Sequence, residues 1–437
     1  MKSFVHWKLY CLLLCIFMLT ACGGGGGGGG NTGTGSGTPA PVPTAKAAWT
    51  FMVYLDADND LDPYASGDLA EMMAVGSSAR VNIIVQYDGY QKPAYRYKVE
   101  KGSLTTLTNL GEVNMASAQA LTDFISFAAS NYPAERYALV LWNHGQGWKS
   151  GSAAKQALSI LSDWDSNGVK SAPLDNSLVA KGIAGGGVTI DVLGVDACNM
   201  ATLEAACEFS SVAGYMVASQ ELVQIKGWDY RDVLTRLTAN PDMTGDGLAR
   251  AAVDSYRTQM NNSGLTDQTM SAIRLADISA VVTAVDSMAR SLKDGISDPA
   301  ILAQITRARG AVQEFDPYVD ANTYVDLTHL ATLITGSAAP VTAAIGKAVI
   351  DEYHGPSRAN AHGLSIAFFN LPVMYTSSNS LKMSLYDPTY INLGATRVNP
   401  AAFLDTTTWG RFLDSYYTLQ YPDIYSKMRT WKYLAQI

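Results

Sequence analysis

The sequence predicts an α/β fold with a mostly parallel central sheet and helices on both faces. Short apolar runs alternate with helix-like segments along the chain, as βαβ units require. The runs are apolar at nearly every position, which is typical of strands covered on both faces. Reactive residues follow directly after two of them, where α/β sheets bind ligands. The expected strands are Trp49–Leu55, Val81–Tyr87, Tyr137–Asn143, Val188–Val195 and Tyr215–Ser219. The expected helices are Tyr64–Val75, Ala116–Ser130 and Met200–Ser210.

Composition excludes several classes of protein. The chain has 437 residues, of which 48% are hydrophobic and 16% charged, so it can bury a large core and is not disordered. Its net charge of -8 argues against a nucleic-acid partner, because such proteins present a basic face. Five cysteines are too few for a disulfide-built scaffold of this length.

The first segment is expected to be a targeting signal. Lys2 and Lys8 give the first residues a positive charge. The apolar run Leu9–Leu19 that follows is too short for an ordinary membrane-spanning helix. The run ends in Leu-Thr-Ala before Cys22, which resembles a bacterial lipobox with a lipidated cysteine. A plain signal peptide with a chance cysteine is the alternative. We expect a signal peptide over residues 1–21 and a flexible Gly/Ser/Thr/Pro-rich tether over 22–46.

This organisation predicts an exported bacterial lipoprotein held at the cell envelope, at the outer membrane if the source is Gram-negative. The lipid is then the only expected contact with the membrane, because the acidic chain lacks a polybasic patch. The globular domain is expected over residues 47–437, with about 277–437 completing the core or forming an accessory region. The oligomeric state cannot be derived from the sequence.

A histidine and a cysteine follow two of the expected strands. His144-Gly145 comes after Tyr137–Asn143, and Cys198 comes shortly after Val188–Val195. Cys198 follows His144 by 54 positions, close to the separation of about 50 that caspases show. An imidazole can take the proton of a thiol and later protonate a leaving amine. We therefore expect a His144–Cys198 dyad, with the Gly145 and Cys198 amides as an oxyanion hole.

Other reactive side chains have simpler interpretations. Cys207 falls inside an expected helix and is interpreted as a core residue. His329 is expected to pack within a helix, His354 to lie in a turn, and His362 to precede a strand rather than follow one. No Cys-x-x-Cys or His-x-x-x-His spacing predicts a zinc site. Outside the tether, no Gly-x-Ser-x-Gly motif predicts a serine hydrolase.

Several blocks in this order resemble the clostripain family of cysteine peptidases, over about residues 48–370. They are Trp49–Leu55 with Asp58–Leu61, Val81–Gly89, Asn143–Gly145, Asp196–Cys198, Ser219–Glu221 with Gly227–Tyr230, and Gly363–Ile366. The resemblance implies a caspase-like fold, protein or peptide substrates, and cleavage after basic residues. It also implies that His144 and Cys198 form the dyad without a required third member.

By the same resemblance, Asp196 is the substrate-binding acid for a basic P1 side chain, since a carboxylate pairs well with a guanidinium. The alternative for Asp196 is a helix N-cap. The chain departs from the family at Gln224-Ile225-Lys226, where Lys226 would repel arginine if it faced the pocket. Some relatives mature by self-cleavage between histidine and cysteine, and Lys149, Lys155 and Lys170 are the basic positions there.

The chemistry requires no cofactor, and calcium is a weaker expectation. Asp163, Asp165 and Asn167 place oxygens at alternate positions, as calcium loops do, but Leu174 stands where an EF-hand has glutamate. Asp56–Asp60 likewise lacks the glycine of such a loop. Polar loops without metal are the alternative for both segments, although calcium dependence is known in the family.

The sequence thus predicts a lipid-anchored cysteine endopeptidase that acts through an acyl-enzyme. Two alternative functions are compatible with the same fold. A non-catalytic surface-binding lipoprotein would have no need for both His144 and Cys198. A cysteine transpeptidase or ligase would share the acyl-enzyme step and differ only in the acceptor.

Overall fold

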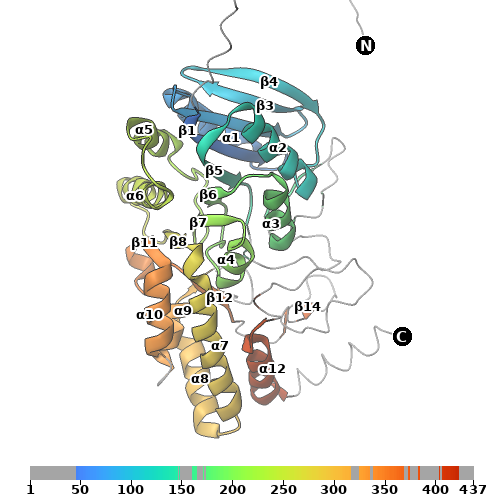
Figure 1. The fold of residues 1–437 in the computed structure, drawn as a ribbon. Helices are drawn as coiled ribbons and strands as arrows, with labels where there is room; N and C mark the ends of the chain where they lie inside the picture. Colours follow the sequence, from blue (N-terminus) through green and yellow to red (C-terminus); the bar gives the residue numbers. More distant parts are fainter. Residues whose placement is uncertain are drawn as a thin grey trace, which may run out of the picture. The chain divides into compact units, whose positions relative to one another are not determined.

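A long twisted sheet organises the chain (Figure 1). The computed structural model describes residues 46–145, 147, 160–164, 171, 174–315, 324–334, 338–368, 373–374, 382–383, 403 and 406–422. Within these residues the sheet has nine strands in the order β11-β8-β7-β6-β5-β1-β2-β3-β4. Their bounds are β1 (Ala47–Ala57), β2 (Val81–Gly89), β3 (Ala94–Glu100), β4 (Ser103–Gly111), β5 (Ala134–Trp142), β6 (Ile190–Asp196), β7 (Ala213–Ala218), β8 (Thr269–Arg274) and β11 (Val349–His354).

The middle of the sheet is parallel, as the apolar runs predict. β7, β6, β5, β1 and β2 pair in parallel, whereas β8 and β11 on one side and β3 and β4 on the other pair antiparallel. Every residue of β1 is buried, because helices cover both faces of the central strands. The carboxyl ends of the five parallel strands therefore meet at one edge of the sheet.

Helices pack on the two faces in separate groups. One face is covered by α1 (Asp62–Val75), α5 (Tyr230–Ala239) and α6 (Gly245–Ser263). The other is covered by α2 (Ala118–Asn131), α3 (Asn176–Gly185) and α4 (Leu203–Phe209). Figure 1 shows α5 and α6 on one side of the sheet and α2 and α3 on the other. Because side chains alternate along a strand, odd and even residues contribute to different cores from Trp49 onward in β1 and from Tyr137 onward in β5.

The region from Leu275 onward both extends the sheet and adds a helical layer. β11 returns to the central sheet, while two small sheets form separately. The helices are η1 (Leu275–Asp277), α7 (Ile278–Gly295), α8 (Pro299–Ala311), α9 (Leu327–Leu333), α10 (Ala338–Ala348), η2 (Pro356–Arg358) and α12 (Trp409–Gln420). The small strands are β9 (Glu314–Phe315), β10 (Tyr324–Asp326), β12 (Ser365–Ala367), β13 (Val373–Met374) and β14 (Lys382–Met383).

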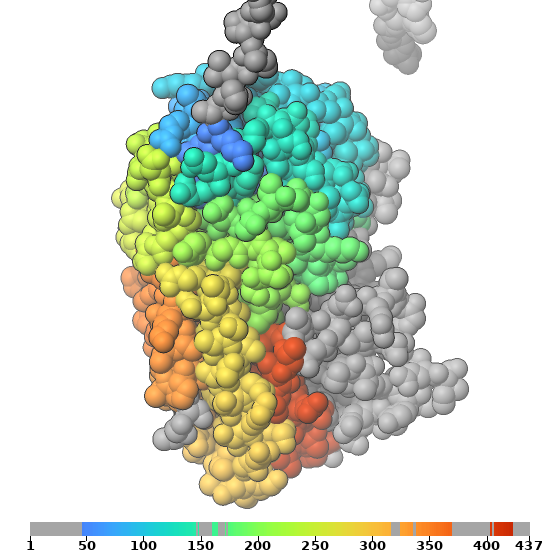
Figure 2. Space-filling view, viewed as in Figure 1, coloured from blue at the N-terminus to red at the C-terminus, as the bar shows by residue number. Residues whose placement is uncertain are grey.

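An aromatic cluster fixes α12 to this layer. The Phe368 ring lies 5.8 Å from Trp409 and 5.3 Å from Tyr416, both in edge-to-face contact. Such contacts favour aromatic rings beyond the area they bury. In Figure 2, α7 and α8 (yellow) lie beside α12 (red), in agreement with the contacts between α7 and α12.

The structure confirms the predicted α/β class and all five predicted strands, with small shifts at their ends. One helix start was wrong: α4 begins at Leu203 rather than Met200, because Thr202 caps it and Asn199 has a left-handed φ of 57°. The expected turn at His354 was also wrong, since His354 ends β11 and pairs with Thr269. In the part of the chain that the structure describes, no helix is long and apolar enough to span a membrane.

Candidate active site

The register of β5 and β6 places the histidine and cysteine at the same edge. Trp142 and Asp196 are paired residues of these neighbouring parallel strands. His144 and Cys198 each follow by two positions, so both leave the sheet at its carboxyl edge. The sequence prediction that these two segments meet is therefore confirmed at the level of the backbone.

Gly145 packs directly against the peptide of Cys198. A Cβ added at Gly145 would lie 2.5 Å from the Cys198 carbonyl oxygen and 3.0 Å from the Cys198 nitrogen. No side chain fits in that space, so glycine is required for this close approach. Gly145 also forms an isolated antiparallel bridge with Ile160. The His-Gly segment and the cysteine peptide thus form one continuous surface.

His144 is half exposed and is oriented by an acidic residue of the loop after β1. Its Nε2 lies 3.0 Å from Asp60 Oδ1, and 45% of its side chain is accessible to solvent. The sequence analysis did not assign Asp60 a role. The available signal was its position just past the carboxyl end of β1, at the same edge as His144. A carboxylate at one ring nitrogen favours a proton there and leaves the other nitrogen to act as a base.

The backbone before His144 is held by the Asn143 side chain. Asn143 Nδ2 donates to the Asp56 carbonyl at 3.0 Å and to the Ser162 carbonyl at 3.1 Å. Its Oδ1 accepts from the His144 amide. Asn143 is buried, so these bonds are shielded from water. The position of His144 therefore depends on the ends of β1 and of the segment around Ser162.

A loop after β7 surrounds the Cys198 thiol. The Val223 amide lies 3.3 Å from Cys198 Sγ and donates to it. The Cys198 thiol also lies 3.9 Å from the Val223 carbonyl, to which it donates, so the Val223 peptide contacts the sulfur through both its N–H and its C=O. The next residue, Asn199, donates from its amide to the Glu221 carbonyl at 3.1 Å and from Nδ2 to the Gln220 carbonyl at 2.9 Å. These bonds hold Asn199 in its left-handed conformation.

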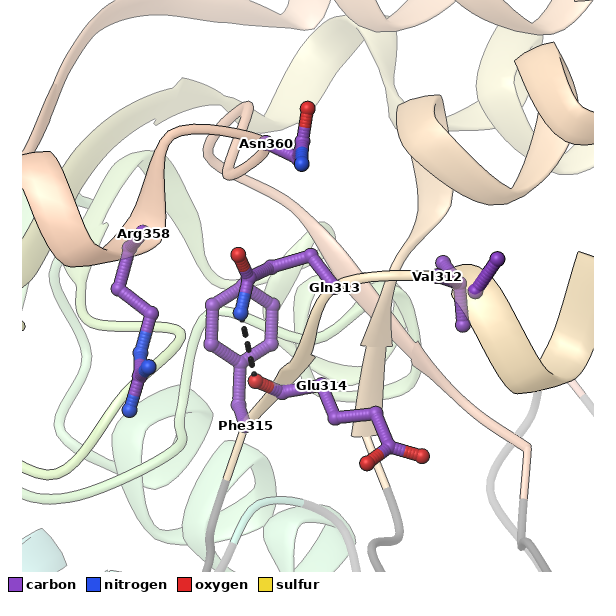
Figure 3. Close-up of a pocket in the computed structure, with 7 residues that line it drawn as sticks. Val312, Gln313, Glu314, Phe315, Arg358 and Asn360 are labelled. Carbon is purple, nitrogen blue, oxygen red and sulfur yellow. Dashed lines mark hydrogen bonds between the residues drawn. The ribbon is translucent and has the colours of Figure 1, made fainter.

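A buried ion pair fixes that loop. The Glu221 carboxylate is 2% exposed and accepts from Arg358 Nε at 2.6 Å. Arg358 also lines a hollow of about 360 Å³ with Gln313, Glu314 and Asn360 (Figure 3). Among the described residues, its lining includes no cysteine or histidine. It borders the loop that contacts Cys198 but does not itself supply the reacting groups.

Asp196 lies below the surface on the α1/α5 face. Its Oδ2 accepts from the Trp228 amide at 3.1 Å and the Tyr230 hydroxyl at 3.0 Å. Burial raises its pKa to about 6, partly offset by these two donors. A Cβ at Gly227, which has a φ of 56°, would stand 2.6 Å from Asp196 Oδ2. The alternative N-cap role for Asp196 is wrong, because α4 begins at Leu203 with Thr202 as its cap.

Two further acids lie on the same face and were missed in the sequence. Asp68 on α1 accepts from Trp142 Nε1 at 2.7 Å, and its pKa is raised to about 9 by burial and by Asp196 and Glu71. Glu71, one helical turn later, accepts from the Tyr230 amide at 2.9 Å. No sequence signal distinguishes these residues from ordinary helix-surface acids.

The other cysteine and two of the other histidines have structural contacts of their own. Cys207 is in α4, and burial raises the pKa of its thiol. His329 Nδ1 accepts from the Gln313 amide at 3.0 Å, in agreement with a packing role. His362 Nδ1 lies 3.0 Å from Asp326 Oδ1, and this contact raises its pKa. Burial accounts for Cys207, and hydrogen bonds within the fold account for His329 and His362.

Two of the three candidate calcium ligands, Asp165 and Asn167, fall outside the described residues, as do Lys149, Lys155 and Lys170. Asp163 is described and is 2% exposed. Its Oδ2 accepts from the Met115 amide at 2.6 Å. Within the described ranges, no three His, Cys, Asp or Glu side chains converge as a formed metal cage.

The contact of Gly145 with Cys198 predicts that a larger residue at position 145 destabilises the fold. Gly145→Ala is expected to lower the free energy of unfolding by about 1–3 kcal/mol, because its methyl group collides with the Cys198 carbonyl. Gly67→Ala is the matched control: this helical glycine has open space around its Cβ position, and alanine should gain about 0.5–1 kcal/mol. Urea unfolding of both variants measures the difference. Equal stability for the two variants would contradict the contact.

Comparison with known proteins shows the family of this chain. The family model described as "Clostripain family" matches residues 53–387. Clostripain from Hathewaya histolytica is 27% identical over a 305-residue alignment covering 56% of this chain. The alignment likewise spans only 56% of that relative's length.

Two solved structures share the fold. One is a secreted C11 cysteine protease from Bacteroides thetaiotaomicron in complex with an irreversible peptide inhibitor. It is 18% identical, has a TM-score of 0.59, and the match covers 76% of this chain and 94% of that one. The other is an inactive zymogen C11 protease from Parabacteroides distasonis, also 18% identical, with a TM-score of 0.57 and coverage of 74% and 92%. Because the family model spans most of the chain and the fold agrees, the chain belongs to the clostripain family of cysteine peptidases.

Proposed function

We propose that this chain is a lipid-anchored cysteine endopeptidase that cleaves after basic residues through an acyl-enzyme. The observation that carries the proposal is the contact of Gly145 with the Cys198 peptide at one edge of the sheet. It brings a histidine-bearing loop and a cysteine-bearing turn together at the carboxyl ends of β5 and β6. Family membership supports the reaction class, and the contacts around each residue support the individual roles.

In the proposed mechanism, Cys198 is the nucleophile and His144 the proton carrier. Once His144 has taken its proton, the Cys198 sulfur can accept from the Val223 N–H and attacks the scissile carbonyl carbon. The Gly145 and Cys198 amides are proposed to donate to the oxyanion that forms. His144 protonates the departing amine, and water then releases the acyl group with His144 as base. Asp60 positions the His144 ring through its contact at Nε2.

Asp196 is proposed to bind the basic P1 side chain. A buried carboxylate with two fixed donors on one oxygen is held rigidly and retains acceptor capacity for a guanidinium or ammonium group. Gly227 supports this role because any larger residue would obstruct the Asp196 carboxylate. Lys226 is exposed, so solvent screens its repulsion of a basic substrate.

The first test concerns the nucleophile. Cys198→Ala is expected to lower turnover of peptide substrates by about a thousandfold or more, because no other group replaces the thiolate. Cys207→Ala is the control, since its thiol is buried in α4 and takes no part. Reporter peptides with Arg, Lys and neutral P1 residues measure turnover. Undiminished cleavage by Cys198→Ala would contradict the mechanism.

The second test uses the pKa of Asp196. Above about pH 6 its carboxyl is charged and attracts a basic P1 side chain; below it, protonation removes that attraction. The ratio of kcat/KM for Arg over neutral P1 should therefore rise with pH through about 6. A ratio is used because titration of the dyad affects both substrates alike. Asp196→Asn should flatten the pH dependence and lower the ratio about 10- to 100-fold, equivalent to about 1.5–3 kcal/mol. If the kcat/KM ratio of Asp196→Asn still rises steeply with pH, a group other than Asp196 determines the preference for arginine.

Export and anchoring are proposed from the sequence, because residues 1–45 lie outside the described part. Cys22→Ser is expected to move the protein from the detergent phase to the aqueous phase in a Triton X-114 partition of cell extracts, since the lipid is the proposed anchor. Cys207→Ser controls for loss of a thiol as such. Detergent-phase partition of Cys22→Ser equal to that of the unmodified sequence would exclude lipidation at this residue.

A further inference from the structure

A buried carboxylate at the end of β10 accepts hydrogen bonds from several elements. Asp326 is 0% exposed, and its Oδ1 accepts from the His329 amide at 2.7 Å, which makes it the N-cap of α9. Its Oδ2 accepts from the His362 amide at 2.6 Å and from Gln220 Nε2 at 3.1 Å. His362 Nδ1 lies 3.0 Å from Oδ1 and 2.9 Å from the Asn360 carbonyl, so it faces two acceptors and carries a hydrogen. A helix cap needs only the first of these bonds.

Gln220 connects this carboxylate to the cysteine turn, residues 198–202. Gln220 is 1% exposed and belongs to the loop after β7. Its side chain is fixed at both ends, because Nε2 donates to Asp326 and Oε1 accepts from the Gly363 amide at 2.8 Å. Its backbone carbonyl accepts from Asn199 Nδ2 at 2.9 Å, and Asn199 directly follows Cys198. Two hydrogen bonds therefore lead from Asp326 to the neighbour of the proposed nucleophile.

Strand β12 holds the same turn. The Ala201 amide donates to the Ser219 carbonyl at 2.9 Å. The Ala201 carbonyl accepts from Ser365, from its amide at 2.9 Å and from its Oγ at 3.0 Å. Ser365 is the register partner of Asp326 in the pairing of β10 with β12, and it also forms an isolated parallel bridge with Thr202. The cysteine turn is thus bonded both to the loop after β7 and to the small sheet that contains β10 and β12.

These contacts give the later part of the chain a role in the reaction. We propose that Asp326 is a positioning residue for the Cys198 nucleophile. It acts through Gln220 and Asn199, and it does not touch the reacting atoms itself. The assignment rests on the proposed function, in which Cys198 attacks the substrate. The region from about residue 277 onward is then required for the chemistry and is more than an accessory to the core.

Charge makes Asp326 a strong anchor for this connection. Hydrogen bonds to an ionised carboxylate are about twice as strong as those between neutral groups, and donors from several elements stabilise the charge in the absence of water. The hydrogen bond to Asp326 chiefly raises the pKa of His362, which is the direction expected beside an anion.

The cysteine turn needs such an anchor because its backbone is strained. Asn199 has a left-handed φ of 57°, which is unfavourable for a residue with a side chain. If the Gln220 carbonyl moves, Asn199 loses the bond from its Nδ2, and Cys198 is free to shift from its contact with Gly145. A displacement of about 1 Å at a reacting group can cost about 100-fold in rate.

The alternative is that Asp326 serves only as a helix cap. Asp298 provides the matched control, because it is exposed and caps α8 by accepting from the Ala300 amide at 2.8 Å. Asp298→Ala therefore removes a helix cap of the same residue type. Gln220→Met complements it, since this change breaks the connection, nearly preserves the buried volume and leaves the α9 cap in place.

Hydrogen exchange of the full chain tests the positioning role directly. In Gln220→Met and Asp326→Ala, the amides of Asn199 and Ala201 should exchange about tenfold faster, because the carbonyls that they donate to belong to the loosened loop. Amides of β1, a buried strand of the central sheet, should keep their rates. Asp298→Ala should leave exchange of the cysteine turn as in the unmodified chain.

Turnover of an arginine reporter peptide tests the consequence for catalysis. In Gln220→Met and Asp326→Ala, kcat should fall about 10- to 100-fold while KM changes less than about twofold. KM is spared because the Glu221–Arg358 pair still holds the remainder of the loop. Asp298→Ala should keep both constants.

The outcomes distinguish positioning from general stability. Unchanged exchange of the cysteine turn in Gln220→Met would overturn the proposal, as would faster exchange with an unchanged kcat. Exchange that rises equally in β1, or an equal loss of kcat in Asp298→Ala, would reduce Asp326 to a structural residue. If circular dichroism shows that Asp326→Ala does not fold, Gln220→Met alone decides. Absence of turnover in the unmodified chain would contradict the proposed function, and exchange of the turn would still decide whether Asp326 positions it.

Discussion

Parallel pairing of β5 with β6 is the constraint on which the proposed active site depends. The pairing of Trp142 with Asp196 sets how far each strand extends before its chain leaves the sheet. A shift by one residue would turn every side chain to the opposite face and separate the His-Gly segment from the cysteine turn. The buried faces of both strands prevent such a shift, because it would expose core residues. The chemistry therefore relies on hydrophobic packing several residues away.

The cysteine turn is restrained by polar contacts rather than by packing alone. Asn199 has a left-handed φ, which is unfavourable for a residue with a side chain, and bonds to Gln220 and Glu221 compensate for it. The Glu221–Arg358 pair then fixes the loop. Breaking a buried ion pair costs about 3–5 kcal/mol. The Val223 N–H consequently stays directed at Cys198 Sγ without depending on substrate.

The parallel core and the two strand-end segments could be predicted from the sequence, because buried parallel strands leave an uninterrupted apolar pattern. The antiparallel strands were harder: β11 is half-buried, with mixed polarity, and His354 looked like part of a turn. Asp60 could have been found by its strand-end position. The pairing of Asp56 with Asp88 could not, because 32 residues separate them and only sheet register brings them together. Asp68 and Glu71 carry no local signal, since their surroundings come from other elements.

Buried carboxyl groups lie on both faces of the sheet, and the two groups differ in the hydrogen bonds that they accept. On the α1/α5 face, Asp196 receives hydrogen bonds from the Trp228 amide and the Tyr230 hydroxyl, so it can remain an anion before substrate arrives. On the α2 face, Asp56 and Asp88 receive none. A carboxylate with fixed donors can wait for a mobile cation such as a P1 side chain. A buried carboxyl group without them is neutralised by a proton, in agreement with the raised pKa values of Asp56 and Asp88. The two groups therefore differ in charge at neutral pH, and the Asp196 group is the one suited to the basic P1 side chain proposed above.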